Sequence, residues 1–376
     1  MIMRKGTGRR ILVITLTILS VAIILGAIIM LASGFQKLSE KEEKINTGFS
    51  SIEINTSLSD VDLVLATDGA CRVVLREQKN LEHTVEVKDG KLKINVNDTR
   101  KWYQHIGISF TSPKITVYLP KSEYAALSVN LDTGNVYVPK DFSFGNIGIS
   151  GSTGNVTSYA AVKDTLNIKT GTGKITVKDS ALGTLNVTAS TGNVTLTNIT
   201  CTSDVSVTLT TGKTTVTTLE CRGFVSEGST GDIVINGLSA SGELSLERST
   251  GKITASAITC AKEALVKVTT GKVHLTDMTC DSLTLEGTTG DLRLTGVISG
   301  GTLTIIRSTG DVIFEDSDGA DITVETTTGS VKGTLLTDKV FTTETDTGNV
   351  DVPDTASGGA CNITTETGNI SIEISG

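Results

Sequence analysis

The chain has 376 residues, a formal net charge of −8, 39 glycines, four prolines and only 4% aromatic residues. The acidic balance argues against nucleic acid and anionic lipid surfaces as partners, because both repel negative charge. Many glycines, threonines and aliphatic residues together favour β structure with frequent tight turns.

The first 35 residues predict a membrane anchor. Residues 1–10 form a basic arm with four Lys or Arg side chains, and Ile11–Phe35 is an uncharged stretch of 25 residues. As a helix this stretch would reach about 37 Å, enough to cross the hydrocarbon core of a lipid bilayer. Because basic residues remain on the cytoplasmic side, we expect a single-pass plasma-membrane protein with a cytoplasmic N-terminus and an extracytoplasmic C-terminal domain. A cleaved signal peptide is the alternative, but its apolar region is usually only about 7–15 residues long.

Two segments separate the anchor from the repeats. Residues 36–44 are rich in Lys and Glu and predict a short charged linker. Residues 45–126 alternate apolar and polar side chains, as at Ile52 and Ile54, without a regular period. We expect these residues to form irregular β-strands that cap the membrane-proximal end of the repeat region.

Residues 127–376 repeat the dipeptide Thr-Gly at intervals of 19 or 20 residues. Apolar residues recur two and four positions after each glycine, and again seven and five positions before it. A third apolar column, which includes Ile199, lies seven positions after the glycine. A short fixed period that keeps its apolar columns in register is typical of stacked repeats. The repeat glycines are Gly134, Gly154, Gly173, Gly192, Gly212, Gly231, Gly251, Gly271, Gly290, Gly310, Gly329, Gly348 and Gly368.

The pattern predicts an all-β fold, a parallel β-solenoid (β-helix) of about 13 coils of 19–20 residues. Each coil has two alternating strands and a short third side, and it buries its apolar residues only by stacking on neighbouring coils. The coils would form a rod about 60 Å long at about 4.8 Å per coil. Glycine suits the corner because it adopts a positive φ without a steric penalty. The handedness of the coil stays open.

Three segments and the repeats carry a family resemblance. Phe49-Ser-Ser-Ile-Glu-Ile, Asp89-Gly-Lys-Leu-Lys-Ile, Ile115-Thr-Val-Tyr-Leu-Pro and the following Thr-Gly-Asn-Val coils resemble the bacterial adhesin family known as domain of unknown function 4097. The resemblance covers residues 45–376. It implies a membrane-anchored β-helical protein of the bacterial cell surface, associated with the cell envelope.

No motif predicts catalysis or a cofactor. His83, His105 and His274 lie far apart in the sequence, so a metal site or catalytic triad is not expected. Arg248 and Arg307 both stand three residues before a repeat glycine. They favour either a substrate groove, as in β-helical carbohydrate-active enzymes, or isolated arginines at the surface.

Acidic residues directly after the repeat glycines raise the question of calcium binding. Asp232, Asp291 and Asp311 share this column with asparagines and with lysines such as Lys272. Because cations alternate with anions there, we expect exposed ion pairs such as Lys272–Asp291, worth under about 1 kcal/mol, instead of a calcium site.

Four cysteines stand nine residues after a repeat glycine, at Cys201, Cys221, Cys260 and Cys280. In adjacent coils their Cα atoms would lie about 5 Å apart, which is within disulfide range. Outside the cytoplasm, Cys201–Cys221 and Cys260–Cys280 therefore form two candidate disulfides. A ladder of small buried thiols is the alternative.

Exposed hydroxyls and a free strand end suggest how the protein binds partners. Thr188, Thr208 and Thr284 belong to an exposed hydroxyl surface on the second strand that suits polysaccharide, and the strand Ile370–Ile374 would leave an unpaired edge for self-association. Our leading hypothesis is a non-catalytic binding, adhesin-like or structural protein of the cell envelope, whose partner is cell-wall polysaccharide or another envelope protein. The alternatives are a β-helical carbohydrate-active enzyme and an accessory or sensor subunit of an envelope-stress membrane system.

Overall fold

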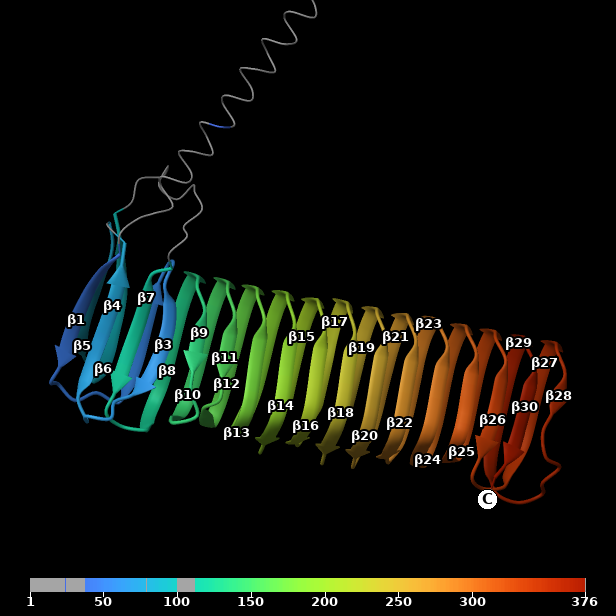
Figure 1. Ribbon diagram of the computed structural model, residues 1–376. Coiled ribbons are helices and arrows are strands. Elements are labelled where there is room, and N and C mark those ends of the chain that lie inside the picture. Colours follow the sequence, from blue (N-terminus) through green and yellow to red (C-terminus); the bar gives the residue numbers. More distant parts are fainter. Residues whose placement is uncertain (1–23, 25–37, 79, 100–111, 376) are drawn as a thin grey trace, which may run out of the picture.

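A computed structural model describes Ile24 and residues 38–78, 80–99 and 112–375. These residues form one 30-stranded sheet, which winds into a parallel β-solenoid of about 12 turns (Figure 1). Within the same residues, no helix is both long enough and apolar enough to cross a membrane. The basic arm 1–10 and, apart from Ile24, the expected anchor Ile11–Phe35 lie outside the described residues.

In the middle of the solenoid, each turn consists of a strand before the corner glycine and a strand after it. We call the two sides of the rod the approach face and the departure face. The approach strands are β8 (Glu123–Thr133), β10 (Ser143–Thr153), β12 (Ala161–Thr172), the second half of β13 (Ile175–Thr191), β15 (Val205–Thr211), β17 (Phe224–Thr230), β19 (Leu244–Thr250), β21 (Glu263–Thr270), β23 (Ser282–Thr289) and the second halves of β24 (Leu292–Thr309) and β25 (Val312–Thr328). The departure strands are β9 (Val136–Val138), β11 (Val156–Ser158), β14 (Val194–Cys201), β16 (Thr214–Cys221), β18 (Ile233–Ala240), β20 (Ile253–Cys260), β22 (Val273–Cys280), β26 (Val331–Leu335) and the first halves of β13, β24 and β25.

All thirteen repeat glycines stack in one ladder along an edge of the rod, with φ between 125° and 159°. Gly212 shows why only glycine fits. A Cβ atom on Gly212 would lie 1.6 Å from the carbonyl oxygen of Gly192, and the residue has a φ of 139°. Its N–H donates to the carbonyl oxygen of Thr230 in the next turn at 2.8 Å. The corner therefore requires both a positive φ and the absence of a side chain.

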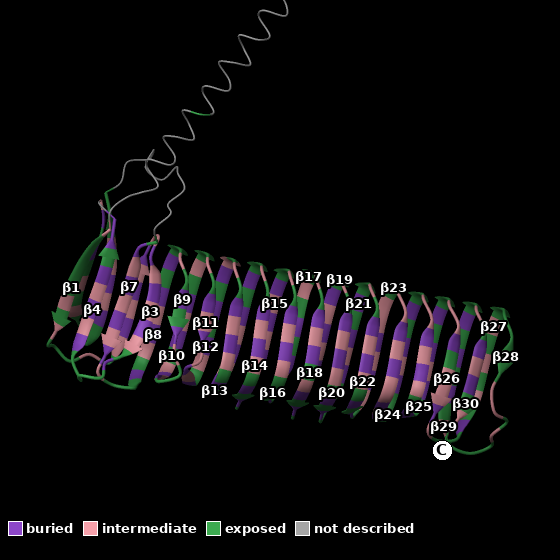
Figure 2. Cartoon of the chain, in the orientation of Figure 1, coloured by how far each residue is buried: buried purple, intermediate pink, exposed green. Residues whose placement is uncertain are grey.

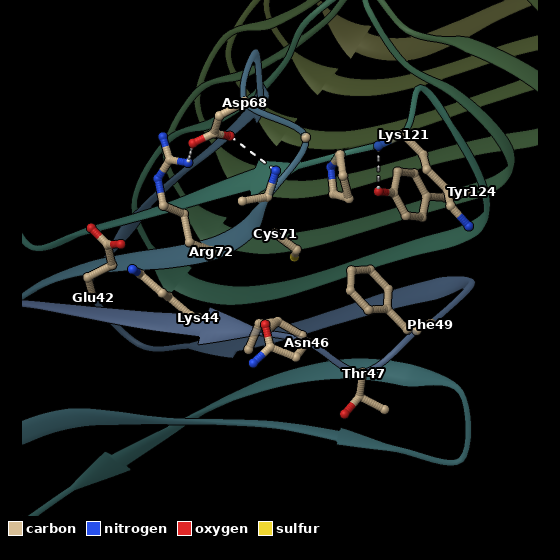
Figure 3. A pocket seen from close by; sticks show the side chains of 15 residues that line it. Glu42, Lys44, Asn46, Thr47, Phe49, Asp68, Cys71, Arg72, Lys121 and Tyr124 are labelled. Carbon is tan, nitrogen blue, oxygen red and sulfur yellow. Dashed lines mark hydrogen bonds and ion pairs between the residues drawn. The ribbon is translucent and has the colours of Figure 1, made fainter.

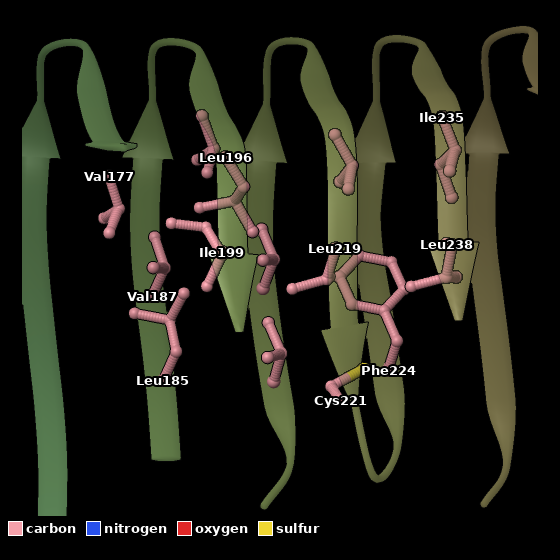
Figure 4. Packing of buried hydrophobic residues seen from close by; sticks show 14 of the residues in the cluster. Val177, Leu185, Val187, Leu196, Ile199, Leu219, Cys221, Phe224, Ile235 and Leu238 are labelled. Carbon is pink, nitrogen blue, oxygen red and sulfur yellow. The ribbon is translucent and has the colours of Figure 1, made fainter. Parts of the chain in front are cut away.

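A second left-handed column lies six residues after the corner glycine and was not recognised in the sequence. Because different residue types occur at this position, the sequence shows no obvious repeat there. Asp and Asn tolerate a left-handed conformation better than most other residues. The turn directs the third apolar column, which includes Ile199, Leu219 and Leu238, into the core (Figure 4). The positive-φ members of this column are Asp179, Asn198, Thr218, Gly237, Ala257, Asp277, Gly296 and Asp316.

The core is a continuous column of aliphatic side chains inside the rod. Buried and more exposed residues alternate along each strand, so buried bands follow one another from coil to coil (Figure 2). Like residues meet in register, as Leu196 does with Val216 and Val216 with Ile235. Phe224 is fully buried between these aliphatic residues (Figure 4). The alternation expected for both faces is therefore present, because parallel strands paired in register hold like residues one above another.

At the N-terminal end, the order of coils in space differs from their order in the sequence. β2 (Ser51–Thr56) lies between β6 (Lys91–Asp98) and β8, and β3 (Asp60–Leu65) lies between β7 (Lys114–Leu119) and β9, all in parallel. β4 (Cys71–Glu77) pairs antiparallel with β7, and β5 (Leu81–Lys88) pairs antiparallel with β6. The region expected to be an irregular cap thus contains two solenoid coils, covered by antiparallel strands.

Most of the expected charged linker 36–44 is strand β1 (Ser39–Ile45), which corrects the prediction. β1 pairs antiparallel with β4 along its whole length. Its lysines and glutamates lie on the outermost strand of this end, where charge discourages pairing with other chains. The charged residues of this segment therefore belong to an edge strand of the sheet and not to a linker.

The C-terminal end exchanges its last two coils as well. β29 (Gly359–Thr367) pairs with β25 on one side and with β27 (Lys339–Thr347) on the other. β30 (Ile370–Ile374) pairs with β26 along its length and with β28 (Val350–Asp351) over its first two residues. The expected free edge is therefore covered in part: the coil of β27 and β28, which comes earlier in the sequence, closes this end (Figure 1) and pairs with Ile370 and Ser371. Self-association through this end stays a prediction.

Candidate functional site: an axial groove on the approach face

Two neighbouring hollows on the approach face form one groove that runs along the rod axis. The first is a cavity of about 540 Å³ between β2 and β13, and the second, of about 350 Å³, lies between β15 and β21. Ser190 on β13 closes the first cavity, and Thr208 on the neighbouring strand β15 opens the second. We call this feature the axial groove; it crosses strands β2 to β21 over about 40 Å.

One wall of the groove carries free hydroxyl groups. It is built from the residues two positions before the corner glycine, which point outward because residues alternate along the strand. None of these hydroxyls has a hydrogen-bond partner within residues 38–78, 80–99 and 112–375. The hydroxyl residues of this wall are Ser152, Ser190, Thr210, Ser229, Ser249 and Thr269.

The opposite wall, four positions before the corner glycine, changes character along the rod. At the N-terminal end it is amide-lined: the Asn130 side-chain amide donates to Asn55 at 2.9 Å, and that of Asn55 donates to Asn95 at 2.8 Å. Further along, Thr208 donates to Glu227 at 3.1 Å, and Lys267 forms an ion pair with Glu286 at 2.8 Å. The hydroxyl and amide groups of the two walls are the hydrogen-bonding groups that a polyhydroxylated ligand requires.

Arg248 lies beneath the floor of the groove and is 2% exposed, so the interpretation as a surface arginine is wrong for this residue. Its guanidinium extends toward the earlier coils, where Gly228 provides the space. It donates to the hydroxyls of Thr214 at 2.9 Å and Ser226 at 3.3 Å, and to the carbonyl oxygen of Glu247 at 2.8 Å. Burial lowers the pKa of Arg248 to about 10. Two hydroxyls at normally apolar positions thus accommodate a buried charge.

Arg307 repeats this arrangement 59 residues later, which is three coils along the rod. It is 4% exposed, and Gly287 stands where Gly228 stands in the first module. Val273 and Leu285 replace the two hydroxyl acceptors, and the Nε and Nη1 atoms of Arg307 are buried without a partner in the described protein. Burial lowers the pKa of Arg307 as well. Both arginines are therefore almost fully buried, and of the two only Arg248 belongs to the lining of the second hollow.

The four stacked cysteines are buried and free. Cys221 and Cys260 each lie in register with Ala240, so the column is continuous through β16, β18 and β20. Burial raises the pKa of the Cys201, Cys221 and Cys280 thiols to about 12, and it raises the pKa of Cys260 too. Such thiols are poor nucleophiles at neutral pH. The disulfides Cys201–Cys221 and Cys260–Cys280 stay a prediction.

The column after the corner glycine has a structural use. Side-chain oxygens of this column accept the backbone N–H of the same column one coil on, as Asn155 does from Lys174 at 2.8 Å and Asp232 from Lys252 at 2.9 Å. Lys272 and Asp291 form the expected exposed ion pair at 2.8 Å. No group of three potential metal ligands occurs in the part of the chain that the structure describes.

The histidines do not converge. His83 is buried in the N-terminal cap, where its Nδ1 lies 3.0 Å from a carboxylate oxygen of Glu77 and its Nε2 lies 2.9 Å from the hydroxyl of Thr56. This order resembles a catalytic triad, but Thr56, His83 and Glu77 are each at most 5% exposed. His274 lies half-buried on the outward side of β22, as expected, and His105 lies outside the described residues.

A further cavity of about 430 Å³ lies at the N-terminal end, among the loops that join the cap strands (Figure 3). Phe49 stacks on Tyr124 with ring centroids 5.8 Å apart, and the Tyr124 hydroxyl accepts the backbone N–H of Lys121. Arg72 forms an ion pair with Asp68 at 2.7 Å on the opposite side. Of the charged residues that line this cavity, Arg72 and Asp68 therefore form an ion pair, and Tyr124 packs on into the core.

The fold and the groove define a class of protein, namely an elongated parallel β-solenoid with a polar groove along its axis. The chain belongs to the Toastrack DUF4097 family, whose model matches residues 49–259 and 239–376. This match confirms the family expected from the sequence. No curated protein matches the chain.

Solved bacterial structures resemble the chain only distantly. A "putative adhesin" from Bacteroides fragilis is 14% identical, with 90% of this chain and 99% of that chain covered and a TM-score of 0.27. A "Putative lipid binding protein" from Parabacteroides distasonis is 12% identical, with 90% and 98% covered and a TM-score of 0.30. A "putative cell adhesion protein" from Clostridium sporogenes is 11% identical, with 90% and 100% covered and a TM-score of 0.21. At these scores the likenesses support no conclusion about ligands.

Proposed function

We propose that the protein is a non-catalytic, adhesin-like binding protein of the cell envelope that holds a linear polysaccharide in the axial groove. The observation that supports this proposal best is the row of unpaired hydroxyls, interrupted at Gly171, beside a groove that spans β2 to β21. A groove parallel to the rod axis suits an extended polymer better than a compact molecule. A polysaccharide offers a hydroxyl or amide partner at each step along such a wall.

The surface chemistry supports a glycan over a protein or nucleic acid. The groove lacks the exposed aromatic and apolar side chains that anchor most protein interfaces, since its lining consists mainly of Ser, Thr, Asn and Gly. The chain's charge of −8 disfavours nucleic acid, which carries a negative charge on every nucleotide.

Blocking the groove tests the proposal. Thr210→Trp and Ser229→Trp place a bulky side chain on the hydroxyl wall, and Thr215→Trp places the same side chain on the departure face as a control. We expect the full-length chain in detergent to bind chitin oligosaccharides or peptidoglycan glycan strands in calorimetry. The two groove variants should lose at least tenfold in affinity, and the control should not. Absence of binding to every linear glycan, or equal losses in all three variants, would refute the proposal.

A carbohydrate-active enzyme is the second candidate, because Glu227 and Glu247 lie directly opposite each other on adjacent strands of the groove wall. Paired carboxylates about 5–10 Å apart carry out glycoside hydrolysis in many enzymes. A turnover assay with the same glycans distinguishes the candidates. Cleavage by the wild type that Glu227→Gln and Glu247→Gln abolish would establish the enzyme; intact glycans after long incubation would exclude it.

We also propose that Ile11–Phe35 anchors the groove outside the plasma membrane. The uncharged length of the segment and the four preceding cations support this orientation. Alkaline extraction of membranes should leave the full-length chain in the pellet and release a chain without Ile11–Phe35. Protease added to intact spheroplasts should cleave the repeat domain, and protection of that domain would contradict the orientation.

A further inference from the structure

Two lysines at equivalent positions of the groove wall have opposite surroundings. Lys267 lies in register with Glu247 on one side and Glu286 on the other, and it forms its ion pair with Glu286. Lys169 lies in register with Ser150 and Thr188. It has no ion-pair partner within the described residues. The strand position is the same, but only the Lys169 ammonium is available to a ligand.

The cavity around Lys169 also contains a hydroxyl without a partner. Ser57 lines this cavity, and its hydroxyl oxygen is buried without a hydrogen-bond partner in the described protein. Thr170 also has an unpaired hydroxyl, but it stands in the inward column of Arg248, three positions before a corner glycine, so its side chain faces the core. Buried polar groups nearly always find a partner, so the unpaired hydroxyl of Ser57 indicates that a ligand or bound water completes it.

Acidic side chains do not neutralise Lys169 within the cavity. Asp132 is the single carboxylate that lines it, and it lies on β8, two strands from β12. No ion pair joins Asp132 and Lys169 in the described structure. The remaining polar lining consists of amides and hydroxyls, including Asn55, Asn130 and Ser152.

From these observations we infer that the cavity between β2 and β13 is a subsite for a carboxylate-bearing sugar, whose carboxylate pairs with Lys169 and whose hydroxyl or amide groups meet Ser57. The inference rests on the proposed function and specifies it: the ligand is an acidic linear glycan, and its acidic group is recognised near the N-terminal end of the groove. The stretch from β15 to β21 then binds uncharged parts of the glycan and does not recognise its acidic groups, because Lys267 is already paired with Glu286.

Two glycans with the same β-1,4-linked backbone test the subsite. Peptidoglycan glycan strands from which the stem peptides have been removed carry a free lactyl carboxylate on alternate sugars, and chitin oligosaccharides of the same length carry none. Calorimetry with the full-length chain in detergent should show about tenfold tighter binding of the acidic strand at low salt. This preference should decrease as salt is added, because the pair is partly exposed.

The variants localise the effect. Lys169→Met should remove the preference and leave the affinity for chitin unchanged, whereas the matched control Lys267→Met should keep it. Ser57→Ala should weaken binding of both glycans about threefold without lowering the thermal midpoint, because the hydroxyl has no partner within the protein. Equal affinities of the wild type for the two glycans, or an unchanged preference in Lys169→Met, would refute the subsite while the groove proposal stands. Absence of binding to both glycans would instead refute the proposed function.

Discussion

The middle of the solenoid and its two ends follow different rules. Between β8 and β26, each coil stacks on the coil that precedes it in the sequence. At the N-terminal end the coil of β2 and β3 lies between two coils that follow it, and at the C-terminal end the coil of β29 and β30 lies inside the coil that precedes it. The repeat thus specifies what a coil is, but it does not specify its position in the stack.

Burial explains the exchange at the C-terminal end. Ile363 on β29 and Ile370 and Ile372 on β30 are at most 2% exposed. The equivalent coil of β27 and β28 carries half-buried Thr343 opposite Ile363, and Val350 remains 45% exposed. Placing the more polar coil outermost keeps the aliphatic residues covered, as expected of a capping repeat. Lys339 reinforces the arrangement through a buried ion pair with Asp318 of β25 at 2.8 Å.

The largest expected effect lies in the glycine ladder of the middle. Gly212→Ala should destabilise the protein by more than about 4 kcal/mol, since the new Cβ would overlap the Gly192 carbonyl oxygen and the residue has a left-handed φ. Gly148→Ala is the control, because nothing lies within 4 Å of its Cβ position. Thermal and urea unfolding should leave Gly148→Ala within about 0.5 kcal/mol of the wild type. Comparable losses in both variants would contradict the ladder.

A second prediction breaks the exchange at the C-terminal end. Ile363→Ala should cost about 2–5 kcal/mol, because it leaves a cavity between two coils. Thr343→Ala, at the position in register on β27, should cost less than about 1 kcal/mol, since the residue lies in the outermost coil. Limited proteolysis and thermal unfolding measure both. If Thr343→Ala were the more damaging change, β27 and not β29 would be the inner strand.

A smaller effect is expected from a comparison of the buried surroundings of Arg248 and Arg307. Thr214→Val removes an acceptor from Arg248 and should cost about 1–3 kcal/mol, because a buried donor loses its partner. Val273→Thr gives Arg307 the hydroxyl that it lacks, and should be neutral or stabilising. Urea unfolding of the two variants checks the pair. A destabilising Val273→Thr would contradict the equivalence of the modules.

The smallest expected effect concerns pH and the N-terminal cap alone. Burial lowers the pKa of His83 below 6.5, although Glu77 partly opposes this shift. A lowered pKa means that the neutral ring stabilises the fold fully above pH 6.5, the ordinary value. This contribution is lost as the pH falls through that value toward the lower pKa of the folded state. The hydrogen-exchange protection factors of β4 and β5, which are corrected for the intrinsic pH dependence of exchange, should therefore decrease between pH 7 and pH 5, with little change in β27.

His83→Gln provides the control for this pH dependence. It should flatten the response of β4 and β5, because glutamine keeps a polar side chain but does not titrate. An unchanged acid response in His83→Gln would assign the effect to another group.

The coils could be predicted from the sequence because glycine and aliphatic columns act locally. The Thr-Gly spacing located each corner, and the alternation before and after it located both strands. The Lys272–Asp291 ion pair also followed, since like positions in adjacent coils must meet. The second left-handed corner was missed because Asp, Asn, Thr, Ala and Gly all occur there.

The groove and the arginines could not be predicted in the same way. The outward or inward direction of Arg248 depends on Gly228, Thr214 and Ser226, which lie up to 34 residues away and act only when two coils are stacked. The free state of Lys169 likewise depends on the neighbours that stacking provides. The residues at one position of the repeat do not reveal which side chains from neighbouring coils will contact one another.

The sequence by itself determined the coil, its corners and the family, because the repeat fixes which residues face inward within one turn of about 20 residues. Only the tertiary structure decided which coil ends the stack, which charges are buried and which lysine remains available. Those outcomes depend on contacts between turns, and the most favourable arrangement is the one that covers the most apolar surface while leaving polar side chains in water.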